Sequence, residues 1–428
     1  MAVNSTDVCI RGRDASSISF NISEPVASVS LRRFPYPFRA MLAVCSDLDE
    51  TPNRHVYWET LRFLNTEEPT TMGVGVGLEV GNSIYFDMPA DQFSYWNTDD
   101  AGRAMIRNLI RSGHIDCLHS FGDFARTREH AGRALDELIR QDCRVRVWID
   151  HAVAPSNFGS DIMQGYGDVR HSEVYHADLT CSYGIQYVWR GRVSSVIGQN
   201  VARSLRGIYN RHHPVASAKT TLKEFFKGLL AYAEQAKYAM HARNHVLGQV
   251  QLRSGQQVSE FLRANPHWGG VGCGATADRI PEVLNESMLN RLITCGGVCI
   301  LYTHLGKIGR QEEPFGPKTQ NAFRQLAAAQ RDGHILVATT RRLLDYHQML
   351  NNIAVKTEAT QDGLRLLVTT ERQDQSDYSG LSFYVPDSNR TDVVVNGKEI
   401  KTLQRNAPDD TQQESVTIPW PRLEFPQL

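Results

Sequence analysis

The stretch Leu118-His119-Ser120-Phe121-Gly122-Asp123 places an imidazole and a carboxylate four positions apart, directly after the mostly apolar run Ile115–Leu118. We expect this run to be a buried strand, so that His119 leaves its carboxyl end and Asp123 lies in the loop or helix that follows. In an α/β barrel, this edge of the sheet is where catalytic side chains gather. Two donors of this kind can face one cation when further ligands converge from elsewhere.

Ionisable side chains also follow other apolar runs of the chain. They are Asp47 and Asp49, Asp150 and His151, and His304, after the runs 40–45, 145–149 and 298–302. Because strand ends meet at one mouth of a barrel, we expect these groups to converge. Each has a structural alternative: Asp is a favoured N-cap for a helix starting near Pro52, and a His can be a satisfied core residue.

The composition is that of a globular protein. The chain has 428 residues, 41% of them hydrophobic, with a formal net charge of −1, which indicates neither nucleic acid nor an anionic membrane as partner. The first residues lack a secretory signal, and the longest apolar stretch, 292–301, is too short to span a bilayer. Five of the eight cysteines lie in or beside strand-like runs, as suits a reducing compartment. We therefore expect a cytoplasmic protein.

Strand-like runs alternate with helical patterns over about 300 residues, which predicts a parallel sheet covered by helices. Seven or eight such units favour a (β/α)7–8 barrel over an open sheet. We assign residues 39–350 to this barrel, 1–38 to a β-leaning N-terminal extension and 351–428 to a small C-terminal antiparallel β-domain. In the last segment, Asn396-Gly397 predicts a hairpin.

The motifs, taken in order, resemble those of the polysaccharide deacetylase (NodB-homology) superfamily. They are Ser46-Asp47-Leu48-Asp49, His119-Ser120-Phe121-Gly122-Asp123, Arg144-Val145-Arg146-Val147-Trp148, Tyr187-Val188-Trp189 and Leu301-Tyr302-Thr303-His304. A fainter similarity, in Trp148–His151 and Tyr166–Asp168, is to deacetylase relatives of bacterial O-antigen gene clusters. The chain departs from the family where Leu48 separates two Asp residues that are usually adjacent, and where the Arg-x-Pro-aromatic segment lacks its proline.

The resemblance implies a distorted (β/α)7–8 barrel of the polysaccharide deacetylase type. It also implies a metal-dependent hydrolase that removes an N-acetyl (acyl) group from an amino sugar or glycoconjugate. Asp49, His119 and Asp123 would hold a divalent ion, Zn²⁺ above others, which polarises the carbonyl and activates water.

The same resemblance implies roles for the remaining residues. Asp47 would be the base, although its role and that of Asp49 can be exchanged, and His304 would protonate the leaving amine. Arg146 would orient the base by charge pairing. The residues expected near the sugar are Asp150, His151, Trp148 and Trp189, of which His151 can also add or replace a metal ligand.

Two other functions remain open from the sequence. One is a glycoside hydrolase on a similar barrel, with Asp150 and either Asp47 or Asp49 as the carboxylate pair. The other is a carbohydrate-binding or scaffold protein without activity, an option that the interrupted Asp pair leaves open.

Overall fold

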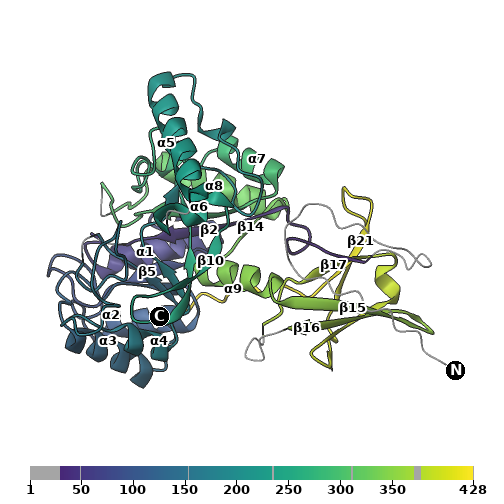
Figure 1. Ribbon diagram of the computed structural model, residues 1–428, viewed down its shortest axis with the longest axis horizontal. Coiled ribbons are helices and arrows are strands. Elements are labelled where there is room, and N and C mark those ends of the chain that lie inside the picture. Colours follow the sequence, from purple (N-terminus) through teal and green to yellow (C-terminus); the bar gives the residue numbers. More distant parts are fainter. Residues whose placement is uncertain are drawn as a thin grey trace. The chain divides into compact units, whose positions relative to one another are not determined.

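The computed structural model describes residues 29–48, 50–152, 154–233, 236–309, 312–370 and 377–427. The chain divides into two compact units (Figure 1). The larger comprises Ala40–Leu343 with Leu423–Leu428, and the smaller comprises Met1–Arg39 with Leu344–Arg422. No helix among the described residues is long and apolar enough to cross a membrane.

The larger unit is built on a sheet of eleven strands, in the order β10-β11-β8-β7-β6-β5-β2-β13-β12-β9, with β14 also paired to β2. The strands are β2 (Ala40–Ser46), β5 (Asn82–Ile84), β6 (Ile115–His119), β7 (Val147–Ile149), β8 (Tyr187–Trp189), β9 (Val193–Ser194), β10 (Leu247–Gln251), β11 (Gln257–Phe261), β12 (Arg263–Ala264), β13 (Val298–Thr303) and β14 (Ile335–Val337). A separate two-stranded ribbon pairs β3 (Pro69–Thr70) with β4 (Gly73–Val74).

The expected (β/α)7–8 barrel of the polysaccharide deacetylase type is wrong. The sheet is mixed, because β10 and β11 are antiparallel, and its strand order is an open path with β14 as a branch. Only Leu262 separates β11 from β12, although β11 pairs with β8 and β12 pairs with β13. The sheet must therefore curl into a half-barrel. Strand–helix alternation is interrupted between Trp189 and Glu286, where the chain forms two-residue strands and a hairpin, and it resumes with the segments that contain β13 and β14.

Helices begin where the local sequence provides a cap. Asn53, Asp99 and Asn285 precede α1, α2 and α7, and each side chain accepts a hydrogen bond from a backbone N–H in the first turn. Asp47 therefore does not cap α1, and that alternative is wrong. The helices are α1 (Arg54–Asn65), α2 (Asp100–Arg111), α3 (Arg128–Arg140), α4 (Ala177–Tyr183), α5 (Pro214–Tyr232), α6 (Ala239–Ala242), α7 (Glu286–Cys295), α8 (Pro317–Arg331) and α9 (Thr340–Leu350).

The core of the larger unit lies between the sheet and helices α1, α2, α3, α4, α7 and α8. Strand β2 is buried along its whole length, as its unbroken apolar sequence predicts. Leu42 and Val44 belong to one cluster with Leu61 of α1 and Leu109 of α2. Since burying each such side chain stabilises the fold by about 1.5–3 kcal/mol, this cluster fixes the strand ends that carry the site.

The smaller unit contains two four-stranded sheets, β1-β17-β21-β20 and β15-β16-β18-β19. All their pairings are antiparallel except that of β16 with β18. The hairpin predicted at Asn396-Gly397 is confirmed: it joins β18 to β19, with φ of 48° and 78° at its two central residues. The strands are β1 (Ser30–Leu31), β15 (Ile353–Thr360), β16 (Gly363–Thr370), β17 (Ser382–Val385), β18 (Thr391–Val395), β19 (Lys398–Glu399), β20 (Gln404–Asn406) and β21 (Glu414–Thr417).

Candidate active site

Five parallel strands of the larger unit end at one edge of the curled sheet. Thr303 of β13 pairs with Ser46 of β2, so that Asp47 and His304, the next residues, leave the sheet side by side. His119 ends β6 and is paired with Ile149 of β7. The residues that follow β5 and β7 are Tyr85, Asp150 and His151.

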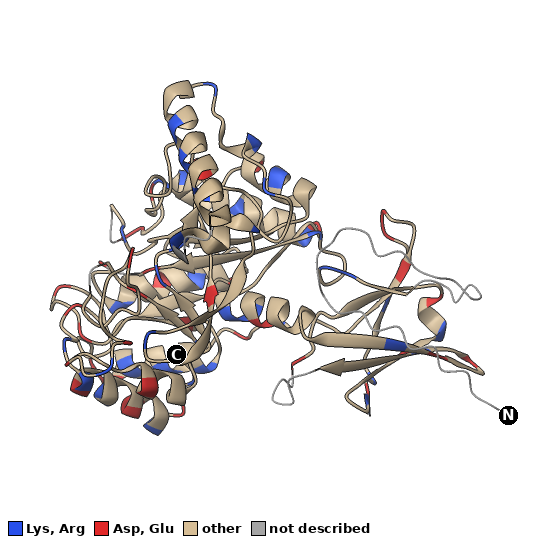
Figure 2. Cartoon of the chain, viewed as in Figure 1, with Lys and Arg blue, Asp and Glu red and all other residues tan. Residues whose placement is uncertain are grey.

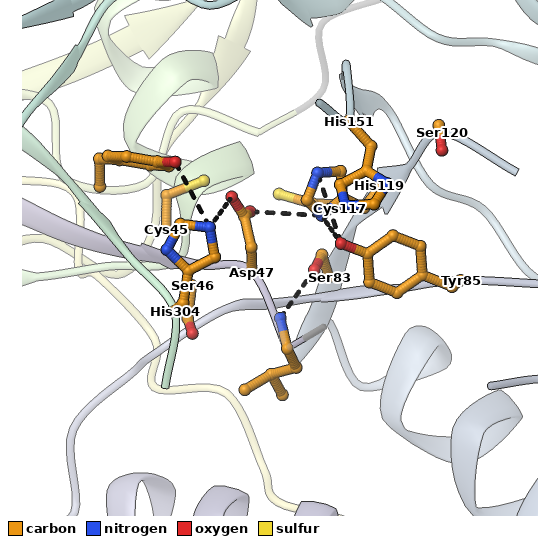
Figure 3. A network of polar contacts seen from close by, with 12 residues as sticks. Cys45, Ser46, Asp47, Ser83, Tyr85, Cys117, His119, Ser120, His151 and His304 are labelled. Atoms are coloured by element: carbon orange, nitrogen blue, oxygen red, sulfur yellow. Dashed lines mark hydrogen bonds and ion pairs between the residues drawn. The ribbon is translucent and has the colours of Figure 1, made fainter. Parts of the chain in front are cut away.

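Asp47 is the centre of this group (Figure 3). Its carboxylate is buried and accepts two hydrogen bonds from Arg263, from Nη1 to Oδ2 at 2.9 Å and from Nη2 to Oδ1 at 2.5 Å. His119 Nδ1 lies 3.5 Å from Oδ1, and His304 Nε2 lies 3.8 Å from Oδ2. Burial alone would raise the pKa of Asp47, but Arg263 and the two imidazoles outweigh burial and hold this pKa well below its usual range.

Arg263 is a fully buried cation from β12. Its guanidinium lies over the rings of Trp189 and Tyr302, at 4.3 Å and 4.9 Å from their centroids, and its Nη2 lies 3.1 Å from the Cys45 sulfur. Burial opposes the charge, but the attraction of Asp47 prevails and raises the pKa of Arg263. The pair therefore stays ionised inside the sheet, with its fork geometry satisfied.

His119 is held in place by Tyr85, whose hydroxyl lies 2.5 Å from its Nδ1. Burial is the main reason that its pKa lies well below the ordinary value, so the imidazole is neutral at pH 7. The turn after it is tight: Ser120 has a φ of 46°, and Gly122 has a φ of 105° and packs on the Asp87 carbonyl. This turn is formed by the stretch 118–123, from which the sequence analysis began.

His304 and His151 are the members of the group that solvent reaches, with His151 17% exposed. His304 is the one of the two that lies beside Asp47. Its side chain is 16% exposed, whereas those of Asp47 and His119 are each 2% exposed. Its Nδ1 lies 3.3 Å from the Ala275 carbonyl, and its Nε2 lies 3.3 Å from the Tyr302 hydroxyl. If Nδ1 carries the proton and donates to Ala275, Nε2 is the nitrogen that exchanges protons, with Asp47 beside it.

Two of the three predicted metal ligands, His119 and Asp123, are described, and each contacts His151. Asp49 lies outside the described residues. Asp123 Oδ1 lies 3.0 Å from His151 Nδ1, while Nδ1 of His119 faces Tyr85 and Asp47. Within the described ranges, no group of three His, Cys, Asp or Glu residues is arranged to hold a metal ion. Because Asp49 is one of the three expected ligands, the Zn²⁺ site stays a prediction, and we derive no chemical step through a metal.

The predicted substrate residues are mostly structural. Trp148 is fully buried, stacks on Phe158 and donates from Nε1 to Asp150 Oδ1 at 2.7 Å. Trp189 is also buried, and its Nε1 donates to the Arg192 carbonyl. Neither indole ring is therefore accessible to a sugar. His151 is only partly buried, and its ring lies against those of Tyr85 and His119, so it does belong to the site.

Arg146 does not orient Asp47. It is exposed and precedes β7, which places it at the amino end of that strand, opposite the site. Arg263 takes this role instead. The sequence carries only a weak signal for it, because Ser259 and Glu260 also interrupt the run 258–264 and its burial is known only from the structure. An Arg buried there needs an anion. Tyr85 follows the short strand β5, whose sequence Asn82-Ser83-Ile84 has no apolar run or period. The sequence therefore gives no signal that Tyr85 belongs to the site.

Comparisons with known proteins add little to this geometry. No protein-family model matches the sequence, and a comparison with curated proteins finds no similar sequence. Among solved structures, the chain is similar to an endo-β1,6-glucanase at 7% identity and a TM-score of 0.33, over 95% of this chain and 94% of that chain. This similarity is below the level at which two chains share a fold, so the chemistry is argued from the site itself.

Proposed function

We propose that this protein is a hydrolase that removes an N-acyl group from an amino sugar or glycoconjugate, with His304 as the proton-transfer residue. The observation that carries the proposal is the contact of Nε2 of a partly exposed imidazole with Asp47, an anion that Arg263 keeps ionised. The order of the sequence motifs supports the substrate class.

Amide hydrolysis needs a proton removed from water and a proton delivered to the leaving nitrogen. In the proposed reaction, His304 Nε2 takes the water proton as the hydroxide adds to the carbonyl carbon. The resulting imidazolium lies next to Asp47, whose negative charge stabilises it. The imidazolium then returns the proton to the nitrogen as the C–N bond breaks, which yields a carboxylic acid and an amine.

The expected role of Asp47 as the base changes in this proposal. A carboxylate with a strongly lowered pKa accepts protons poorly, because base strength falls with pKa. Its value lies in a permanent negative charge next to His304. Arg263 fixes both carboxylate oxygens, so Asp47 cannot rotate away from the imidazole.

The glycoside hydrolase alternative is less well supported, because Asp150 is already used by the fold. It is fully buried, and its two oxygens accept hydrogen bonds from Trp148 Nε1 and from the backbone N–H groups of Phe158 and Gly159. Burial raises the pKa of Asp150 to about 7, a value suited to an acid catalyst, but the carboxyl group has no exposed surface from which to reach a sugar.

The test is to incubate the full chain with N-acetylated amino-sugar oligosaccharides and measure two products at once, acetate and new reducing ends. We expect acetate alone. His304→Ala should lower acetate release by about 10²–10⁴-fold, while His55→Ala, an exposed imidazole on α1, should leave it unchanged.

Each alternative has its own result in this assay. Reducing ends without acetate would favour a glycosidase. Oligosaccharide binding without either product would favour the non-catalytic alternative.

A further inference from the structure

Helix α5 is arranged with its apolar side outward. Its buried residues are small or polar, namely Ser217, Thr220, Glu224, Gly228 and Ala231. Six of its seven large apolar side chains are 48–82% exposed, and they are Val215, Leu222, Phe225, Phe226, Leu229 and Tyr232. The seventh, Leu230, is half-buried. A soluble helix normally places these classes the other way round. Figure 1 shows α5 standing out from the rest of its unit, in keeping with this exposure.

The exposed apolar side chains form one continuous face. At 100° per residue they fall within an arc of about 120° on the helical wheel, which is the width of a typical buried stripe. Lys219 and Lys223, both exposed, follow along one border of this arc. The only acid of the helix, Glu224, is buried and paired with Lys227 and Arg203.

The charge of this region differs from that of the whole chain. Residues 203–243 contain eight Lys and Arg against two Glu, a net charge of +6, whereas the full chain carries −1. Figure 2 shows α5 with several basic residues and one acidic one. An occupant of this face must therefore be apolar where the phenylalanines dock and negative along its border.

We propose that α5 docks this protein on the surface of an anionic lipid bilayer. Apolar side chains on one face with lysines along its border are the properties of a helix that lies in the membrane interface. Phe225 and Phe226 would enter the boundary of the acyl chains, while Lys219 and Lys223 would stay at the phosphates.

A second copy of the chain fits this face less well. A two-fold interface brings the same patch of both copies together, so it would set a positive border against a positive border. An anionic bilayer supplies the opposite charge and an apolar layer at the same time. The proposal does not depend on the reaction proposed above.

The test is flotation of the full chain with vesicles of phosphatidylcholine alone or of an equimolar mixture with phosphatidylglycerol. We expect binding to the anionic vesicles, and weaker binding at 1 M salt, where the screening length falls to about 3 Å. Lys219→Glu with Lys223→Glu should weaken binding by at least about 30-fold. Phe225→Ser with Phe226→Ser should weaken it by about 100-fold.

Matched controls separate this face from the rest of the surface. Lys318→Glu with Arg331→Glu reverses two exposed charges on α8, and Ile139→Ser removes an exposed apolar residue of α3, so both should bind like the parent. Circular dichroism of every variant checks the fold.

Two outcomes would overturn the proposal. One is no binding to either vesicle, which would point to a protein partner. The other is concentration-dependent dimerisation that Phe225→Ser with Phe226→Ser abolishes while vesicles stay unbound, which would identify a second copy as the occupant.

Discussion

Replacing Arg263 by Met should destabilise the larger unit strongly, because it leaves Asp47 buried without its counter-ion. Methionine keeps most of the side-chain volume beside Trp189 and Tyr302, so the main change is the loss of the charge and its two hydrogen bonds. Removing one partner of a buried ion pair typically costs about 3–5 kcal/mol.

Protonation sets an upper limit to that cost. Without Arg263, burial would raise the pKa of Asp47, and keeping the carboxyl neutral at pH 7 costs about 1.36 kcal/mol for each unit above the unfolded value near 3.9, or about 4 kcal/mol. The folded variant then binds a proton that the unfolded chain has released, so the variant loses stability as pH rises from about 4 to 7. In the parent, the lowered pKa of Asp47 contributes stability above about pH 4 that is lost at lower pH.

Urea denaturation followed by tryptophan fluorescence reports on this unit, since five of the six tryptophans belong to it. We expect a loss of about 3–4 kcal/mol at pH 7 that shrinks towards pH 4. Asp47→Asn with Arg263→Met should recover most of it, because no buried charge remains. Arg54→Met breaks an exposed pair with Asp99 and should cost far less, because water screens that pair. A loss for Arg263→Met no larger than that for Arg54→Met would refute the reasoning.

Three further predictions concern the neighbourhood of the site. Tyr85→Phe removes the hydroxyl 2.5 Å from His119 Nδ1 and should cost about 1–3 kcal/mol in the same denaturation assay, with no effect if that contact is absent in solution. Gly122→Ala should cost about 1–3 kcal/mol or more, because its φ is 105° and a Cβ would lie 2.2 Å from the Asp87 carbonyl oxygen. Gly132→Ala, in α3 with open space around it, should instead stabilise by about 0.5–1 kcal/mol, and equal effects of the two would contradict the turn geometry. With its pKa raised to about 7, Asp150 should lower the stability of the parent by about 3–5 kcal/mol between pH 4 and pH 7, and a pH titration of Asp150→Asn should lack that slope.

Local patterns determined much of the secondary structure. The run 40–45 lies in strand β2, and the helical periods of residues 100–111 and 340–350 form α2 and α9. These segments carry an unbroken apolar run or a helical period, and both signals depend only on neighbouring residues. The Asn396-Gly397 hairpin could be predicted for the same reason. Its turn needs two residues that tolerate positive φ, and both are neighbours in the sequence.

Sequence order also placed Asp47, His119, His151 and His304 at the ends of strands, where the structure finds them together. The residues that each of them contacts come from distant parts of the chain. Asp123 pairs with His151, and the cation that pairs with Asp47 is Arg263, which lies 216 positions away in the chain. The curl of the sheet brings β12 beside β13, and nothing local to Arg263 reports that approach. Strand pairing over such separations depends on how the whole chain closes, so only the tertiary structure could choose the partner of the buried carboxylate.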